Sequence, residues 1–275
     1  MRRQAFTPQW GRDISFSPTH AVVSPADAAD TAVNAGPWHL LGGAVTACGP
    51  VRRENQDAFR LIPLEGVGLG LILADGMGGH SGGGEAAEAA VAAAAAWIGS
   101  ADGGNDGLRE AVSRANEAVA EVRRQLGGNP GTTIVAAVII DGRLSLAHAG
   151  DSRAYLLRNG EATQLTADHS VTGERVRAGI LDPEVARHDP RRNYVTRALL
   201  GAPVEPDLAE TALAAGDVVL LCSDGLWEPL ADREIAGLAG GGVAPGEASR
   251  LLVAAALAAG STDNVTAVVA RLDPV

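Results

Sequence analysis

Three apolar segments of the chain end in the same way, and the first of them reads GLGLILAD (68–75). A short apolar run that leads into Asp75-Gly76 and a glycine-rich turn is typical of a buried strand. The pattern returns in LSLAHAGD (144–151) and in VVLLCSD (218–224), which end in Asp151 and Asp224. We therefore expect three strands that each present a carboxylate at their C-terminal end.

Two further aspartates open strands instead of closing them. Asp57 precedes AFRLI and Asp263 precedes NVTAVVA. In an antiparallel sheet the end of one strand lies beside the beginning of its neighbour, so all five carboxylates could gather at one edge. For any single Asp, an ordinary turn is the simpler explanation. As a group, the carboxylates would repel one another unless a cation neutralised them, and hard oxygen ligands favour Mg²⁺ or Mn²⁺ over zinc.

Short β-type runs alternate with alanine-rich helical stretches along the chain. Hairpin signals at Asp141-Gly142 and Asn159-Gly160 favour antiparallel pairing. Strands are predicted over 43–48, 57–63, 68–74, 132–140, 143–149, 152–158, 161–165, 217–223 and 264–271. Helices are predicted over 83–98, 107–126 and 245–259, with a helical patch at 170–187 inside a long polar insertion.

The first part of the chain differs from the rest. Residues 1–38 contain Pro, Ser, Thr and Asp without apolar periodicity, and they are predicted to be a loosely ordered N-terminal extension. Residues 39–275 are predicted to form one domain of layered sheet and helix.

Composition excludes several kinds of protein. All 22 basic side chains are arginine, so a phosphate loop with its lysine, a protein kinase and a Schiff-base enzyme are ruled out. The net charge of −11 argues against sequence-independent nucleic-acid binding. The two cysteines form no zinc or disulfide pattern, and no apolar run is long enough to span a membrane. We expect a cytoplasmic protein.

Eight short motifs follow one another between residues 42 and 271. They are GPVRRENQDAF (49–59), LADGMGGHSGGGEAA (73–87), GTT (131–133), AGDSRAYLLRNG (149–160), LTADHS (165–170), RRNYVTRALLG (191–201), LLCSDGLWEPL (220–230) and STDNVTAVV (261–269). Any one of them is weak evidence, but the ordered set is specific. In this order they resemble the metal-dependent protein phosphatases, the type 2C or PPM class, in their bacterial form.

The resemblance implies an α+β fold, a four-layer αββα sandwich of two mainly antiparallel sheets flanked by helices. It also implies a centre of two Mn²⁺ or Mg²⁺ ions at one edge, with Asp75 bridging them. A third, weaker ion in many bacterial members corresponds to Asp151 and Asp224. Glu228 stands where some relatives use another carboxylate, and its role is left open. The implied metal ligands are Asp57, Asp75, Asp224 and Asp263, with the carbonyl of Gly76.

Two other residues match functional positions of the family. Arg52 corresponds to the arginine that binds the phosphate, a role that suits the two parallel hydrogen bonds of a guanidinium. His80 corresponds to a histidine of the bacterial motif, while Met77 stands where some relatives carry a histidine. His80 either donates a proton to the leaving oxygen or hydrogen-bonds to the water around the metals, and we favour the second role. The 170–192 insertion corresponds to the family's flap, and a solvated helix explains it equally well.

The resemblance implies a serine/threonine protein phosphatase that uses a metal-activated water. Its partners would be phosphorylated proteins, the substrates of a serine/threonine kinase, and we expect a monomer that acts in signalling. Two alternatives stay open. One is a catalytically silent relative that binds phosphoproteins, although all four core aspartate positions are filled here. The other is a phosphomonoesterase that acts on small molecules.

Overall fold

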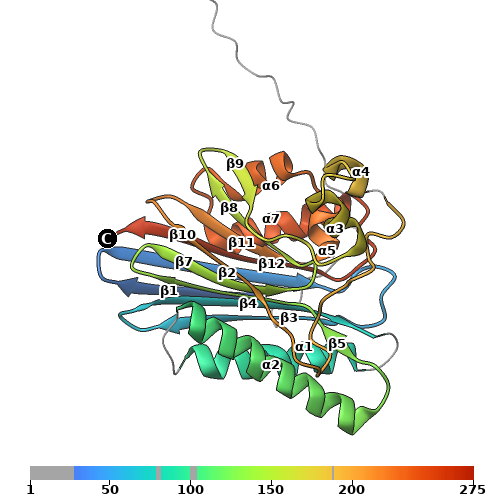
Figure 1. The fold of residues 1–275 in the computed structure, drawn as a ribbon. Coiled ribbons are helices and arrows are strands. Elements are labelled where there is room, and N and C mark those ends of the chain that lie inside the picture. Colours follow the sequence, from blue (N-terminus) through green and yellow to red (C-terminus); the bar gives the residue numbers. More distant parts are fainter. Residues whose placement is uncertain (1–27, 79–81, 100–103, 188) are drawn as a thin grey trace, which may run out of the picture.

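Two β-sheets lie face to face, and helices cover both outer faces (Figure 1). The computed structural model describes residues 28–78, 82–99, 104–187 and 189–275. Every strand pair in these residues is antiparallel. The predicted α+β fold with four αββα layers is therefore confirmed.

Each sheet is built from strands that are far apart in the sequence. The first sheet has the order β1 (Ala28–Ala35), β2 (Trp38–Ala47), β12 (Val265–Pro274), β11 (Val218–Cys222), β8 (Arg153–Arg158) and β9 (Glu161–Gln164). The second has the order β10 (Asp207–Ala212), β7 (Arg143–Ala149), β6 (Ile134–Ile140), β4 (Gly68–Met77) and β3 (Asp57–Leu64), and the short β5 (Gly131–Thr132) pairs with β4.

The helices cover the sheets in two groups. Helices α1 (Gly83–Ile98) and α2 (Asn105–Leu126) lie on the second sheet, and α6 (Asp232–Ala239) and α7 (Pro245–Ala258) lie on the first. Small residues let helix and sheet approach closely, since a Cβ on Gly43 would lie 2.2 Å from the nitrogen of Gly246. Helices α3 (Val171–Arg177) and α4 (Pro183–Arg187) belong to the insertion, and α5 (Asp224–Trp227) is a single turn after β11.

The apolar runs found in the sequence are buried on both faces. In β4, Leu71 and Leu73 point into the core between the sheets, while Ile72 faces α1 and α2. In β11, Leu221 points into the central core and Cys222 faces the helices of the other layer. This alternation explains why these strands read as continuous apolar segments, because a strand between two apolar layers has no polar face. Cys222 is fully buried and packs as a small apolar side chain.

Most of the predicted elements are present, with bounds that differ by a few residues, and some short elements were missed. Helix α1 has the predicted bounds, and the predicted 170–187 patch is two short helices, α3 and α4. The prediction of a loosely ordered N-terminal extension is wrong for residues 28–38, since β1 pairs with β2 along its whole length. Residues 1–27 lie outside the described residues. Strand β10 and the helices α5 and α6 were not predicted.

None of the helices in the described ranges is long and apolar enough to cross a membrane.

Candidate metal centre

The carboxylates at the strand ends converge on one edge of the two sheets. Asp57 at the start of β3 lies directly opposite Asp75 in β4. Asp224 begins α5 just after β11, Asp263 precedes β12, and Asp151 follows β7. A cleft of about 930 Å³ opens at this edge, and its lining includes Asp75, Gly76, Asp151, Asp224, Asp263 and Arg52. Four of the five predicted carboxylates thus share one cavity.

The fifth carboxylate, Asp57, lies behind the cleft and is only 7% exposed. Its Oδ2 accepts hydrogen bonds from Ser223 Oγ at 2.8 Å and from Thr266 Oγ1 at 2.6 Å. Its Oδ1 has no hydrogen-bond partner among the described residues, and the same is true of Asp224 Oδ1. Buried polar atoms are nearly always paired, so two unpaired oxygens at one site indicate a ligand that both would bind.

Gly76 follows Asp75 where the chain has no room for a side chain. A Cβ at Gly76 would lie 2.3 Å from the carbonyl oxygen of Gly83, at the start of α1. The backbone at Asp75 is held by β5 and the residue after it, because the Asp75 N–H donates to Thr133 Oγ1 and its carbonyl accepts from Thr132 Oγ1. Thr132 and Thr133 therefore support the site by holding the backbone of Asp75.

The backbone around Asp151 is fixed from two sides. Gly150 has a φ of 131° and a Cβ there would lie 2.5 Å from Thr133 Cβ, so only glycine fits. The Gly150 N–H donates to His169 Nδ1 at 3.1 Å, and the His169 N–H donates to the Gly150 carbonyl. Trp227 Nε1 donates to the Asp151 carbonyl at 3.0 Å. His169 therefore has a structural role here, because it holds the backbone of Gly150.

Burial and mutual repulsion raise the pKa values of these carboxyl groups. Burial raises the pKa of Asp57 to about 6 and that of Asp151 to about 7. The pKa values of Asp75 and Asp224 lie well above the ordinary range, first because of burial and then because of neighbouring carboxylates. Such a cluster strongly favours binding of positive charge.

The donor set fits hard divalent cations that keep part of their water. Among the described residues, no three or more His, Cys, Asp or Glu side chains lie close enough together to surround one ion by themselves. Mg²⁺ in particular is usually held by one or two carboxylates, with water in the remaining positions. Oxygen ligands facing one open cleft suit this mode of binding, and the described lining of the cleft includes no cysteine or histidine.

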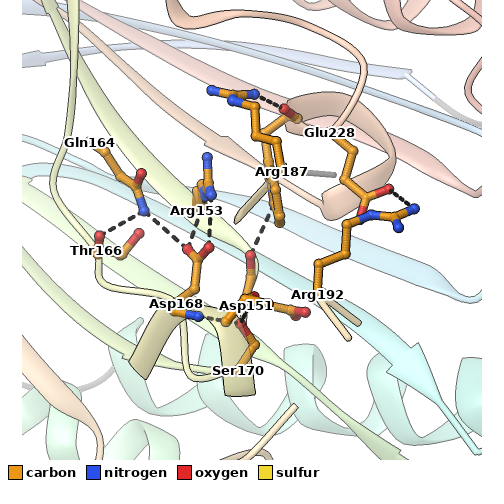
Figure 2. Close-up of polar contacts among 12 residues, drawn as sticks. Asp151, Arg153, Gln164, Thr166, Asp168, Ser170, Arg187, Arg192 and Glu228 are labelled. Atoms are coloured by element: carbon orange, nitrogen blue, oxygen red, sulfur yellow. Dashed lines mark hydrogen bonds and ion pairs between the residues drawn. The ribbon is translucent and has the colours of Figure 1, made fainter. Parts of the chain in front are cut away.

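The other predicted residues have different surroundings. Arg52 lines the cleft and its guanidinium forms an ion pair with Asp263. His80 lies outside the described residues. Glu228 is bound by Arg192, with Nε to Oε1 at 2.7 Å and a second hydrogen bond at 3.1 Å (Figure 2). The structure thus brings Arg52 to the carboxylates and places Glu228 in contact with the insertion.

Sequence reasoning missed two groups of residues at this site. Ser223 and Thr266 were not assigned a role, although both occur inside the quoted motifs, next to Asp224 and near Asp263. Residues 193–195 form part of the cleft lining and were also missed. Their motif was recognised, but no pattern in the chain shows that this segment reaches the cleft.

Known proteins share the fold and much of the sequence. The family model of protein phosphatase 2C matches residues 96–265. The serine/threonine protein phosphatase PstP of Mycobacterium tuberculosis is 43% identical over 229 residues, which cover 81% of this chain and 43% of PstP. The chain therefore spans less than half of that relative. Protein phosphatase PhpP of Streptococcus pneumoniae is 35% identical over 229 residues, covering 81% of this chain and 93% of PhpP.

Solved structures agree with this relationship. The catalytic domain of PstP, in a crystal structure with two manganese ions, is 38% identical with a TM-score of 0.76. The alignment covers 86% of this chain and 99% of that one. Serine/threonine phosphatase Stp1 of Staphylococcus aureus is 30% identical with a TM-score of 0.77, covering 84% and 94%. With the family match over more than half of its length, this chain belongs to the protein phosphatase 2C family.

Proposed function

We propose that the chain is a metal-dependent phosphatase that hydrolyses phosphoserine and phosphothreonine in proteins. The observation that carries the proposal is the cleft in which Asp75, Asp151, Asp224 and Asp263 meet beside Arg52. The names of PstP and PhpP, and the manganese ions in the PstP structure, support it. The cytoplasmic setting, the monomeric state and the role in signalling remain predictions.

We assign the cation ligands to Asp57, Asp75, Asp224 and Asp263 with the Gly76 carbonyl, and a third, weaker site to Asp151 and Asp224. Bound Mn²⁺ or Mg²⁺ would supply an activated water and offset the charge of the phosphoryl oxygens. Ser223 and Thr266 orient Asp57 so that its free Oδ1 is the oxygen left for binding. With cations bound, the negative charge of the carboxylates would be neutralised, and the site of an otherwise acidic protein could accept an anionic phosphate.

Arg52 is well placed to bind the phosphate. Its side chain is half exposed in the cleft, and its partner Asp263 is itself an assigned cation ligand. A guanidinium makes two parallel hydrogen bonds to a phosphate, so it fixes orientation as well as charge. Arg52 would therefore hold the phosphoryl group beside the carboxylate cluster.

Turnover of a phosphothreonine peptide tests the proposed function. In Mn²⁺ or Mg²⁺ we expect the peptide to be hydrolysed, and excess EDTA should abolish the reaction because the carboxylates alone provide no activated water. Phosphate release is measured in parallel with a nucleoside monophosphate. Full activity in EDTA would contradict the mechanism, and a clear preference for the nucleotide would favour a small-molecule phosphomonoesterase. No turnover of either, with cation binding intact, would favour the silent relative.

The Arg52→Ala variant tests the phosphate-binding role. We expect KM for the peptide to rise about 10- to 100-fold, because hydrogen bonds between charged groups are worth about 1.5–3 kcal/mol, with a smaller change in kcat. Kinetics are measured at saturating Mn²⁺, since the variant also removes the partner of Asp263. Arg143→Ala is the matched control, because Arg143 pairs with Glu210 on the second sheet. An unchanged KM in Arg52→Ala would contradict the assignment.

A further inference from the structure

A second part of the cleft wall carries none of the assigned cation ligands. Asn193, Tyr194 and Val195 line it from the segment that follows the insertion, and Val51 lines it from the loop before β3. At about 930 Å³, the cleft is near the upper end of the range for sites that enclose a whole drug-sized ligand. It therefore has room for a phosphorylated residue together with its neighbours in a peptide.

Tyr194 is an exposed aromatic side chain in this part of the cleft wall. The chain has only two tyrosines, and the other, Tyr155, is fully buried. Tyr194 is 63% exposed and Val51 is 69% exposed, although both line the same cleft. A tyrosine ring offers a large contact area at a small cost in conformational entropy, which makes it a frequent anchor in recognition sites.

The backbone of Tyr194 is fixed even though its side chain is exposed. Its N–H donates to the Arg191 carbonyl at 3.1 Å, and its carbonyl accepts from the Val171 N–H at 2.9 Å. The next residue, Val195, forms a β-bridge with Ser170. A ring on a fixed backbone is preorganised, so a ligand that packs against it orders little additional chain.

An ion pair ties this wall to the carboxylate cluster. Arg192 binds Glu228 through two hydrogen bonds, and the Glu228 N–H donates to the Asp224 carbonyl at 2.9 Å. Arg192 thus holds the chain just before Asn193 to the same helical turn that begins with Asp224. Nearby, Arg187 donates to the carbonyl of Leu230 and to Asp232 (Figure 2 shows Arg187, Arg192 and Glu228).

We propose that Tyr194 is a specificity-determining residue, which contacts the side chain next to the phosphorylated residue and favours an apolar one. Val51 provides a second apolar contact in the same cleft. Arg192 is a positioning residue, which sets the distance between the tyrosine ring and Asp224. The proposal rests on the proposed function, and it narrows the substrates to phosphopeptides with an apolar side chain beside phosphoserine or phosphothreonine.

Two matched phosphothreonine peptides test the proposal. They differ only in the residues flanking phosphothreonine, which are Leu in one peptide and Ser in the other. For the wild type in saturating Mn²⁺ we expect kcat/KM to be about 10-fold higher for the Leu peptide, which is the low end of apolar discrimination because Tyr194 and Val51 are largely exposed. Tyr194→Ala should reduce the ratio to near one, and Tyr194→Phe should keep it, because the ring supplies the contact.

Control measurements separate the proposal from the proposed function. Ile180→Ala is the matched control, because Ile180 lies on the insertion and is 67% exposed. It should keep the wild-type ratio. Turnover of p-nitrophenyl phosphate, which has no flanking residues, reports on the carboxylate site alone. A wild-type ratio near one, or an unchanged ratio in Tyr194→Ala, overturns the role of Tyr194. If the wild type hydrolysed neither the peptides nor p-nitrophenyl phosphate, the proposed function would be overturned instead.

Arg192→Met tests the positioning role. It should lower the ratio of kcat/KM between the Leu and Ser peptides at saturating Mn²⁺ by raising KM for the Leu peptide. Arg192→Lys should keep only part of the wild-type ratio, because lysine retains the charge but lacks the planar fork that makes two parallel hydrogen bonds. Titration of Mn²⁺ by electron paramagnetic resonance shows whether cation affinity has changed. An unchanged ratio in Arg192→Met overturns the positioning role.

Discussion

Turnover of a phosphothreonine peptide is expected to fall by at least about 100-fold in the Asp224→Asn variant, and Asp75→Ala should have the same effect. Loss of a residue that only supports a metal ligand lowers metal affinity or activity by about 10- to 100-fold, so loss of the ligand itself should lower activity at least as much. Asparagine keeps the size of the side chain and removes its negative charge. Because Asp224 Oδ1 has no hydrogen-bond partner in the described part of the chain, the fold does not depend on that oxygen.

The measurement combines kcat at saturating Mn²⁺ with a Mn²⁺ titration by electron paramagnetic resonance, and circular dichroism confirms that the variants fold. Asp141→Asn is the matched control, since Asp141 is an exposed turn residue with a φ of 49°, which asparagine tolerates. It should behave as the wild type. A folded Asp224→Asn variant with wild-type kcat would show that Asp224 is not a ligand needed for the reaction.

The second large effect concerns stability. We expect Asp75→Asn to be more stable than the wild type without divalent cations and less stable than the wild type in Mn²⁺. Burial, followed by the charges of Asp57 and Asp224, raises the pKa of Asp75 well above its ordinary value. The unfolded chain therefore loses this proton at lower pH than the folded chain does. Without divalent cations, the folded state loses stability as the pH rises above about 4, and the loss is complete only above the raised pKa.

In EDTA at pH 7.5, Asp75→Asn should therefore be more stable than the wild type and unfold at a higher Tm, because asparagine places no negative charge beside Asp57 and Asp224. Saturating Mn²⁺ should reverse the order, because a cation at 100 times its Kd stabilises the wild type by about 2.7 kcal/mol and the variant loses most of this gain.

Thermal unfolding followed by circular dichroism, in EDTA and in Mn²⁺ at pH 5 and 7.5, measures these differences. The Asp141→Asn control should follow the wild type in all four conditions. If Asp75→Asn were less stable than the wild type in EDTA at pH 7.5, the repulsion among the carboxylates would not be the dominant effect. An equal gain from Mn²⁺ in both proteins would show that Asp75 does not contribute to cation binding.

The central strands and the main helices could be predicted because their signals are local. The apolar run before Asp75 is buried on both faces of β4, and the alanine-rich segment that follows forms α1 with the predicted bounds. The edge strands β1 and β10 were missed for the opposite reason. Both contain several exposed positions among partly or fully buried ones, and their sequences, AADTAVNA and DLAETA, contain few β-branched or aromatic residues.

The sequence alone determined which carboxylates belong together, because each stands at the end or the beginning of an apolar strand and antiparallel pairing brings such ends to one edge. Only the tertiary structure decided how they are held and what faces them. Ser223 and Thr266 reach Asp57 across 166 and 209 residues of sequence, and Arg192 reaches Glu228 across 36. Contacts of this kind depend on how sheets and insertion fit together, and no local spacing specifies them. The position of Tyr194 in the cleft wall likewise depends on how the sheets and the insertion pack together.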